Sequence, residues 1–179
     1  MEKVSVKDFP NIKIGIIASI VYVFLVFLDL GFQSKYRTIT QTWSIIPLIL
    51  LVIYFLYCIY NIHKILKKTT NGGYPISPDA AAFRMLIPFY NLYWFFKWPN
   101  EIANFINKNS KNKKLQIEKN VSGIIMSLLI ITAFIPIPIG DMVFFRIFNV
   151  FGFFFYFLLL NNFTKKIKGV LNENQLLEE

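Results

Sequence analysis

Few side chains in this sequence are able to do chemistry. It holds one cysteine, Cys58, and one histidine, His63. A single cysteine leaves no disulfide or thiolate metal site within one chain, and a single histidine leaves no multi-histidine metal or haem site. The sequence also lacks a nucleophile paired with a base, a metal-ligand cluster and a phosphate-binding loop. We therefore predict no catalytic residue, no metal and no cofactor, and a protein that is not an enzyme.

Both single residues have simple structural interpretations. Cys58 lies in an apolar run, where a buried and inert thiol is expected. His63 follows the end of that run and precedes lysines. The pattern favours a cation that is stabilised by the negative end of a helix dipole.

Two charged residues, Asp29 and Arg146, lie inside apolar runs, each about one helical turn from the end of its run. A charge within a membrane span is costly without a partner. If both runs cross a bilayer, helix rise places the two side chains at similar depth, so they are a candidate intramembrane ion pair. A structural pair, separate snorkelling to the interface and a functional pathway all remain open as roles.

A second candidate site surrounds two prolines, Pro88 and Pro99. Arg84, Asn91 and Lys97 lie beside or between them. These polar residues could line a cytoplasm-facing pocket for a lipid headgroup or a small anion. Alternatively, the basic residues anchor the segment at the level of the lipid phosphates, and Asn91 pairs with backbone groups freed by the prolines.

The loop that follows is basic, with Lys111, Lys113 and Lys114 close together. It could bind anionic lipid or an acidic partner, or it could only fix the orientation of the chain. Large aromatic residues are predicted to act as anchors at the membrane–water interface. They are Trp43, Tyr90, Tyr93, Trp94 and Trp98.

The composition indicates a membrane protein. Of the 179 residues, 55% are hydrophobic and 18% are aromatic, and the mean hydropathy is +0.50, which is too apolar for a soluble domain of this size. The formal charge of +9 would raise the question of nucleic acid in a soluble protein. Here the basic residues gather between apolar runs without a nucleic-acid-binding motif, so topology and anionic lipid explain the charge and no nucleic acid partner is expected.

The apolar runs predict an all-α membrane protein with four transmembrane helices. The first run shows no cleavage pattern after Leu28, so we expect it to stay attached. The polar end of the chain, at about 169–179, is predicted to be a mobile tail. The expected spans lie at about 14–32, 43–62, 121–135 and 142–160.

Between the second and third spans lies an unusual segment at about 78–107. Ser77, Pro78 and Asp79 are typical of a helix start, and Pro88 and Pro99 are expected to break the helix. If the segment does not cross the membrane, 16 of the 19 positive residues fall on one side. The positive-inside rule therefore favours an interfacial or re-entrant segment, with both chain termini in the cytoplasm.

The order of residues in this segment resembles a family of uncharacterised small bacterial multi-pass membrane proteins, known as domain of unknown function 4328. The resemblance covers about a quarter of the chain. It implies the same membrane architecture and draws attention to the central segment, but it implies no activity. Its residues are Ser77-Pro78, Ala81, Ile87-Pro88-Phe89-Tyr90-Asn91-Leu92-Tyr93-Trp94, Pro99 and Glu101-Ile102.

These patterns predict a single integral domain over residues 1–179 in the plasma membrane of a bacterium. We expect a non-enzymatic accessory or interaction subunit that docks a partner or anionic lipid on its cytoplasmic face. Membrane lipids and another membrane protein, or further copies of the chain, are the expected partners. The alternative is a transporter or channel component that uses the broken segment at 78–99 as a half-helix site.

Overall fold

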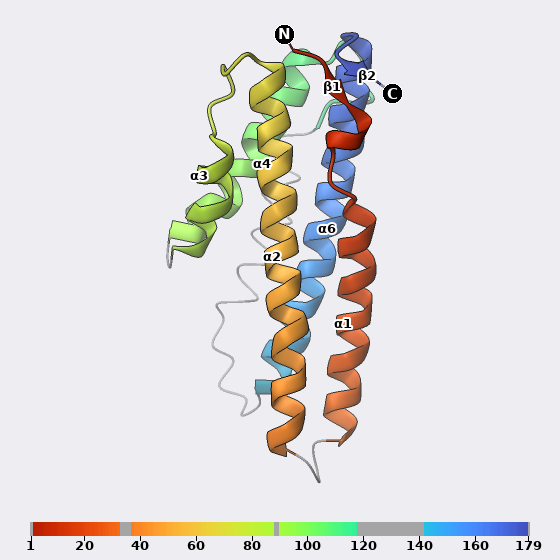
Figure 1. Cartoon of the computed structure of the whole chain (residues 1–179), viewed down its shortest axis with the longest axis vertical. Helices are drawn as coiled ribbons and strands as arrows, with labels where there is room; N and C mark the ends of the chain where they lie inside the picture. The colour runs from red at the N-terminus through yellow and green to blue at the C-terminus, as the bar shows by residue number, and fades with distance from the viewer. Residues whose placement is uncertain (1, 33–36, 88–89, 118–141, 179) are drawn as a thin grey trace.

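The structure, a computed structural model, is mostly helical (Figure 1). It describes residues 2–32, 37–87, 90–117 and 142–178. Within these ranges it describes the backbone alone at 29–32, 37–45, 91–92, 95 and 142–150.

Three long helices run side by side and form the body of the molecule (Figure 1). They are α1 (Ile12–Phe32), α2 (Arg37–Thr69) and α6 (Met142–Glu173), and α1 packs along both of the others. The ring of Phe55 in α2 lies 5.9 Å from that of Phe153 and 5.7 Å from that of Phe157 in α6, measured between centroids. Edge-on aromatic packing of this kind joins the helices.

These helices contain three of the four expected spans, those at 14–32, 43–62 and 142–160. The span expected at 121–135 lies outside the described residues. Two helical stretches in the described part of the chain, Val6–Leu28 and Ile46–Thr69, are long and apolar enough to cross a membrane. Both α2 and α6 also continue past the predicted ends of their spans, by about two turns or more.

Large apolar side chains are exposed along one part of each long helix, which we call the apolar band. A contiguous surface of this kind is unfavourable in water, whereas hydrocarbon solvates it. The band consists of Ile14, Ile17, Ile20, Val21, Phe24, Leu25, Phe27 and Leu28 on α1, Ile46, Ile49, Leu50, Ile53 and Tyr57 on α2, and Phe151, Phe155 and Leu158 on α6.

A helical hairpin packs against the C-terminal part of α2. After α2 ends, Gly72 adopts a φ of 85°, the left-handed conformation that favours glycine beyond a helix end. The hairpin consists of α3 (Pro78–Phe83), the 3-10 turn η2 (Arg84–Leu86) and α4 (Tyr90–Asn109). Its two arms meet beside the middle of α2 (Figure 1), and we call Phe83–Ile87 together with Tyr90 the hairpin tip.

The predicted helix start at residue 78 is confirmed. The hydroxyl of Ser77 accepts a hydrogen bond from the backbone N–H of Ala80 at 3.2 Å, and Pro78 occupies the first helical turn. Proline has no backbone N–H. This costs nothing in the first helical turn, because the first N–H groups of a helix have no acceptor within the helix.

The expectation that Pro99 breaks the segment is wrong. α4 runs through Pro99 without interruption. Proline removes one hydrogen bond from a helix interior, but Trp98 and Ile102 on either side are fully buried. Packing of these side chains therefore holds the helix together across the proline.

The two ends of the chain lie together at one end of the bundle (Figure 1). β1 (Val4–Ser5) pairs in parallel with β2 (Leu177–Glu178), and the short 3-10 turn η1 (Val6–Asp8) leads from β1 towards α1. The N–H of Val4 donates to the carbonyl of Leu176 at 2.9 Å, and Lys3 forms an ion pair with Glu178 at 3.4 Å.

The structure differs from the expected mobile tail at 169–179. α6 continues to Glu173, and the side chains of Val170 and Leu171 are buried in the core. Apolar residues at helical spacing therefore extend the packed part of α6 beyond the expected span at 142–160.

A glycine permits close approach of α1 to α6. A Cβ atom added at Gly15 would overlap the ring of Phe157, which is fully buried. A Cβ added at Gly152 in α6 would meet no described atom within 4 Å. The contact that needs a small residue is therefore at Gly15.

We expect Gly15→Ala to lower the free energy of unfolding by about 1–3 kcal/mol, because the new methyl group overpacks a filled site. Gly152→Ala is the matched control and should change stability little. Thermal unfolding of both variants in detergent tests this. Phe157→Leu should partly restore the Gly15→Ala variant, and a Gly15→Ala protein as stable as the parent would contradict the close contact.

Candidate membrane-interface site

The hairpin tip exposes large apolar side chains outside the three-helix bundle. Phe83, Leu86 and Ile87 are 63%, 57% and 51% exposed. Tyr90 and Tyr93, at the start of α4, are also exposed. Five large apolar or aromatic groups therefore cluster on one small and otherwise isolated surface.

Arg84 lies within this surface and contacts two aromatic rings. Its guanidinium carbon is 5.1 Å from the centre of the Trp94 ring and 5.9 Å from that of Tyr90. The indole N–H of Trp94 donates to the carbonyl of Ala81 at 3.0 Å and joins the two arms of the hairpin. Cation–π contacts leave the N–H groups of an arginine free for phosphate, so the arrangement suits a lipid headgroup.

Lys97 lies about two turns after Tyr90 in α4. Its ammonium group pairs with the carboxylate of Glu101 at 3.3 Å. The hydrogen bond with Glu101 raises the pKa of Lys97 above its ordinary value. Arg84 and Lys97 therefore have different partners in the described structure. The first contacts aromatic rings at the tip, and the second pairs with a carboxylate.

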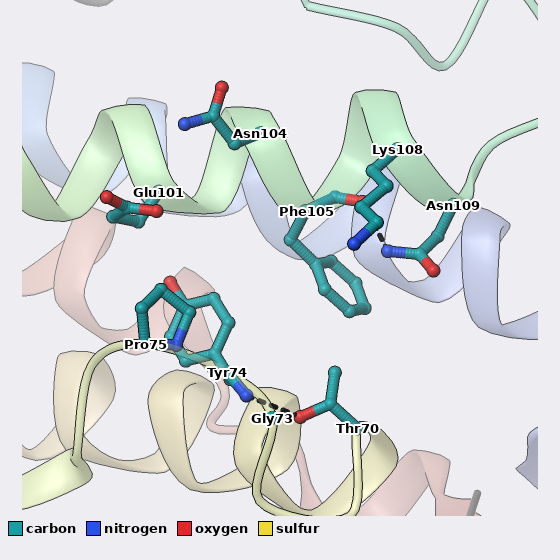
Figure 2. Close-up of a pocket in the computed structure, with 9 residues that line it drawn as sticks. All are labelled: Thr70, Gly73, Tyr74, Pro75, Glu101, Asn104, Phe105, Lys108 and Asn109. Carbon is teal, nitrogen blue, oxygen red and sulfur yellow. Dashed lines mark hydrogen bonds between the residues drawn. The ribbon is translucent and has the colours of Figure 1, made fainter.

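A polar pocket of about 440 Å³ lies at the other end of the hairpin, where the α2–α3 loop faces the last turns of α4. Figure 2 shows Thr70 and Tyr74 on one side and Lys108 on the other, with the ring of Phe105 between them. The remaining lining residues are Gly73, Pro75, Glu101, Asn104 and Asn109. The pocket mixes a carboxylate, an ammonium group and amides, so it does not select one charge.

Beside this pocket, three buried polar aromatic residues, among them the lining residue Tyr74, have nitrogen or oxygen atoms without a hydrogen-bond partner among the described residues. They are His63 at both ring nitrogens, Tyr74 at its hydroxyl and Trp98 at its indole nitrogen. The ring of His63 lies 5.4 Å from that of Tyr74 and 6.4 Å from that of Trp98. Burial, and then the carboxylate of Glu101, raise the pKa of Tyr74 above its ordinary value.

The prediction that His63 is a cation at a helix end is wrong. α2 continues beyond it to Thr69, and the imidazole is fully buried without an acceptor. An imidazolium would have no compensating partner in these surroundings. His63 is therefore a packing residue at the base of the hairpin.

The predicted aromatic anchors divide into two groups. Tyr90 at the hairpin tip and Tyr93 one turn further along α4 are exposed, as an anchor requires. Trp94 and Trp98 are buried, and Trp98 packs against Phe163 of α6 at 6.2 Å between ring centroids. Trp98 therefore holds the hairpin to α6, whereas Trp94 joins the two arms of the hairpin, and neither ring is exposed as an anchor requires.

The basic loop after α4 is fastened at both ends. The side chain of Asn107 exchanges two hydrogen bonds with the backbone of Ile117, at 2.8 and 2.7 Å. Glu173 of α6 accepts from the hydroxyl of Ser110 and from the backbone N–H of Lys111. Lys111, Lys113 and Lys114 are exposed between these contacts, and no described carboxylate lies within 4 Å of their ammonium groups.

Four predicted site residues have no described side chain. The side chains of Asp29, Arg146, Asn91 and Trp43 lie outside the described part of the structure, so the ion pair of Asp29 with Arg146 stays a prediction. Cys58 is buried, as expected for an inert thiol. Among the described residues, no group of three or more His, Cys, Asp or Glu is placed to hold a metal ion.

Comparison with known proteins adds no relative: no family model, no curated protein and no solved structure matches this chain.

Two tyrosines provide a matched test of these contacts. The hydroxyl of Tyr54 donates to the carbonyl of Asn11 at 2.7 Å and links α2 to the start of α1, whereas that of Tyr74 has no partner. We expect Tyr54→Phe to lower the free energy of unfolding by about 0.5–1.5 kcal/mol. Tyr74→Phe should leave it unchanged or raise it, because it removes a buried group that makes no hydrogen bond.

Thermal unfolding of both variants in the same detergent measures the difference. A loss of stability in Tyr74→Phe as large as that in Tyr54→Phe would mean that the Tyr74 hydroxyl has a partner, such as a buried water.

Proposed function

We propose that this chain is a non-enzymatic, four-span protein of a bacterial plasma membrane, and that its cytoplasmic face docks anionic lipid. Both termini lie on that face. The proposed spans lie in α1, in α2, at 121–135 and in α6. The proposal keeps the architecture implied by the resemblance to the uncharacterised bacterial family.

The positions of the chain ends support an even number of crossings. The pairing of β1 with β2 puts residues near both termini side by side. Ile117 is fastened to Asn107 at the end of the bundle where the termini lie, and α6 begins at Met142 towards the opposite end (Figure 1). The described residues on either side of 118–141 therefore lie towards opposite ends of the bundle, which is the arrangement that the proposed span at 121–135 requires.

The observation that carries the proposal is the separation of apolar and basic surface. Except for Val6, every exposed large apolar side chain in the described structure lies in the apolar band, at the hairpin tip or at Tyr93. Exposed lysines lie beyond the band, at the end of the bundle with the termini. They include Lys64, Lys67, Lys68, Lys108, Lys111, Lys113, Lys114 and Lys165. A basic end next to an apolar band suits a membrane whose cytoplasmic leaflet is anionic.

The alternative of a transporter or channel component would use Arg84, Asn91 and Lys97 around a half-helix end. Lys97 is already paired with Glu101, and α4 does not end at Pro99. These contacts favour the docking function. The cytoplasmic face could instead bind a partner protein, which would also make this chain an accessory subunit. The test below distinguishes a partner protein from lipid.

We expect the combined change of Lys111, Lys113 and Lys114 to Gln to reduce the anionic lipid retained by the purified protein. Each lysine near an anionic surface contributes about 1 kcal/mol, or about fivefold in affinity. The measurement is mass spectrometry of lipids that remain bound after gentle detergent extraction, with phosphatidylglycerol counted against phosphatidylethanolamine. The matched control changes the same three residues to Arg and should retain lipid like the parent.

Equal retention by the Gln and Arg variants would contradict lipid docking by this loop. A protein that co-purifies in stoichiometric amount and is lost from the Gln variant would replace lipid with a partner subunit.

A further inference from the structure

The hairpin and the two long helices beside it share a common register. Trp98 of α4 contacts both His63 of α2 and Phe163 of α6. About three turns further along, the side chain of Asn174, directly after the end of α6, donates to the carbonyl of Asn109 in α4 at 3.1 Å. Both contacts join residues 65 positions apart, so α4 and α6 run in the same direction and advance together.

This register gives the level of the tip. Tyr90 precedes Trp98 by eight residues, about 12 Å of helix. The same distance back along α2 and α6 leads from His63 to Phe55 and from Phe163 to Phe155. Tyr90 therefore lies at the level of residues 55 and 155.

These levels fall inside the apolar band. The last exposed apolar side chains of the band are Tyr57 on α2 and Leu158 on α6, two or three residues beyond the level of Tyr90. The start of α4 is therefore about 3–5 Å inside the edge of the band. Leu86 and Ile87, which precede Tyr90 at the turn of the hairpin, belong to the same surface.

The chemistry of the tip agrees with this level. Phe83, Leu86 and Ile87 are more than half exposed and have no described protein partner that covers them. Arg84, next to Phe83 in the chain, and the exposed Tyr90 and Tyr93 at the start of α4 add groups that prefer the headgroup region. A helical segment with an apolar face and a basic border is typical of insertion by about 5–10 Å into the boundary between headgroups and acyl chains.

We infer that the hairpin tip is inserted into the cytoplasmic leaflet, with Phe83, Leu86 and Ile87 among lipid acyl chains and Arg84 at the phosphates. The inference rests on the proposed membrane location and deepens it, because it assigns lipid as the occupant of the tip. It also decides between the two predicted placements of the segment. The hairpin dips into one leaflet and returns, and it neither crosses the membrane nor lies flat on it.

The depth of the tip is testable with a fluorescent label. Cys58 is fully buried, so single cysteines are introduced into the native sequence, with the parent protein as the control for background labelling. Ile87→Cys reports the tip, Phe24→Cys on α1 reports an exposed position of a span, and Asn104→Cys reports an exposed polar position of α4. Each is labelled with an NBD group in detergent and reconstituted in phosphatidylethanolamine–phosphatidylglycerol vesicles that carry nitroxide-labelled lipids.

We expect the label at 87 to be quenched most by a nitroxide near the top of the acyl chain and the label at 24 by one deeper in the chain. The label at 104 should be quenched by iodide in the water and not by acyl-chain nitroxides. As a second measurement, Ile87→Glu should weaken acyl-chain quenching of a label at position 83, introduced as Phe83→Cys, while Asn104→Glu should not.

The outcomes separate the two proposals. If the label at 24 is quenched by lipid and the label at 87 only by iodide, the tip is in water and this inference fails while the membrane proposal stands. If neither quencher reaches 87, protein covers the tip, and the inference also fails. If the label at 24 is open to iodide and closed to lipid, the proposed membrane location itself fails.

Discussion

The contact of Trp98 with α2 and α6 is the constraint on which the arrangement of the hairpin depends. Its ring lies between His63 and Phe163 and is fully buried, and burying a side chain of this size contributes several kcal/mol. Because α4 is a continuous helix on both sides of Trp98, this one contact sets the level of both ends of α4 along the bundle. Towards its start it sets the level of the tip, and towards its end it sets the position of the basic loop.

The same contact explains why polar atoms are buried without partners. His63, Tyr74 and Trp98 offer flat rings that fill the space between the α2–α3 loop, α4 and α6, but their nitrogen and oxygen atoms do not face one another within hydrogen-bond distance. Each such atom costs about 1–3 kcal/mol when it is left unpaired. The apolar area of three aromatic rings offsets this cost, so the base of the hairpin is held by packing and not by a hydrogen-bond network.

Sequence patterns with a local cause predicted the structure well. Apolar runs gave the positions of α1, α2 and the first part of α6, and Ser77 with Pro78 gave the start of α3, because capping acts within one turn. Features that depend on distant residues were missed. Pro99 stays inside a helix, His63 is buried, and Val170 and Leu171 belong to the core, since each outcome depends on packing against another helix. The exposure of Tyr90 and the burial of Trp94, four residues later, likewise became clear only when the hairpin was placed.

In the insertion that we infer, charge limits how deep the hairpin can reach. The Lys97–Glu101 pair lies on the same helix as Tyr90, seven to eleven residues further on, or about 10–16 Å along its axis. Hydrocarbon disfavours an ion pair even when the partners are close, so the pair must stay at or beyond the headgroups. The apolar tip favours insertion, while the ion pair opposes any further movement inward. The two effects balance at a shallow depth, which agrees with the level given independently by the contacts of Trp98.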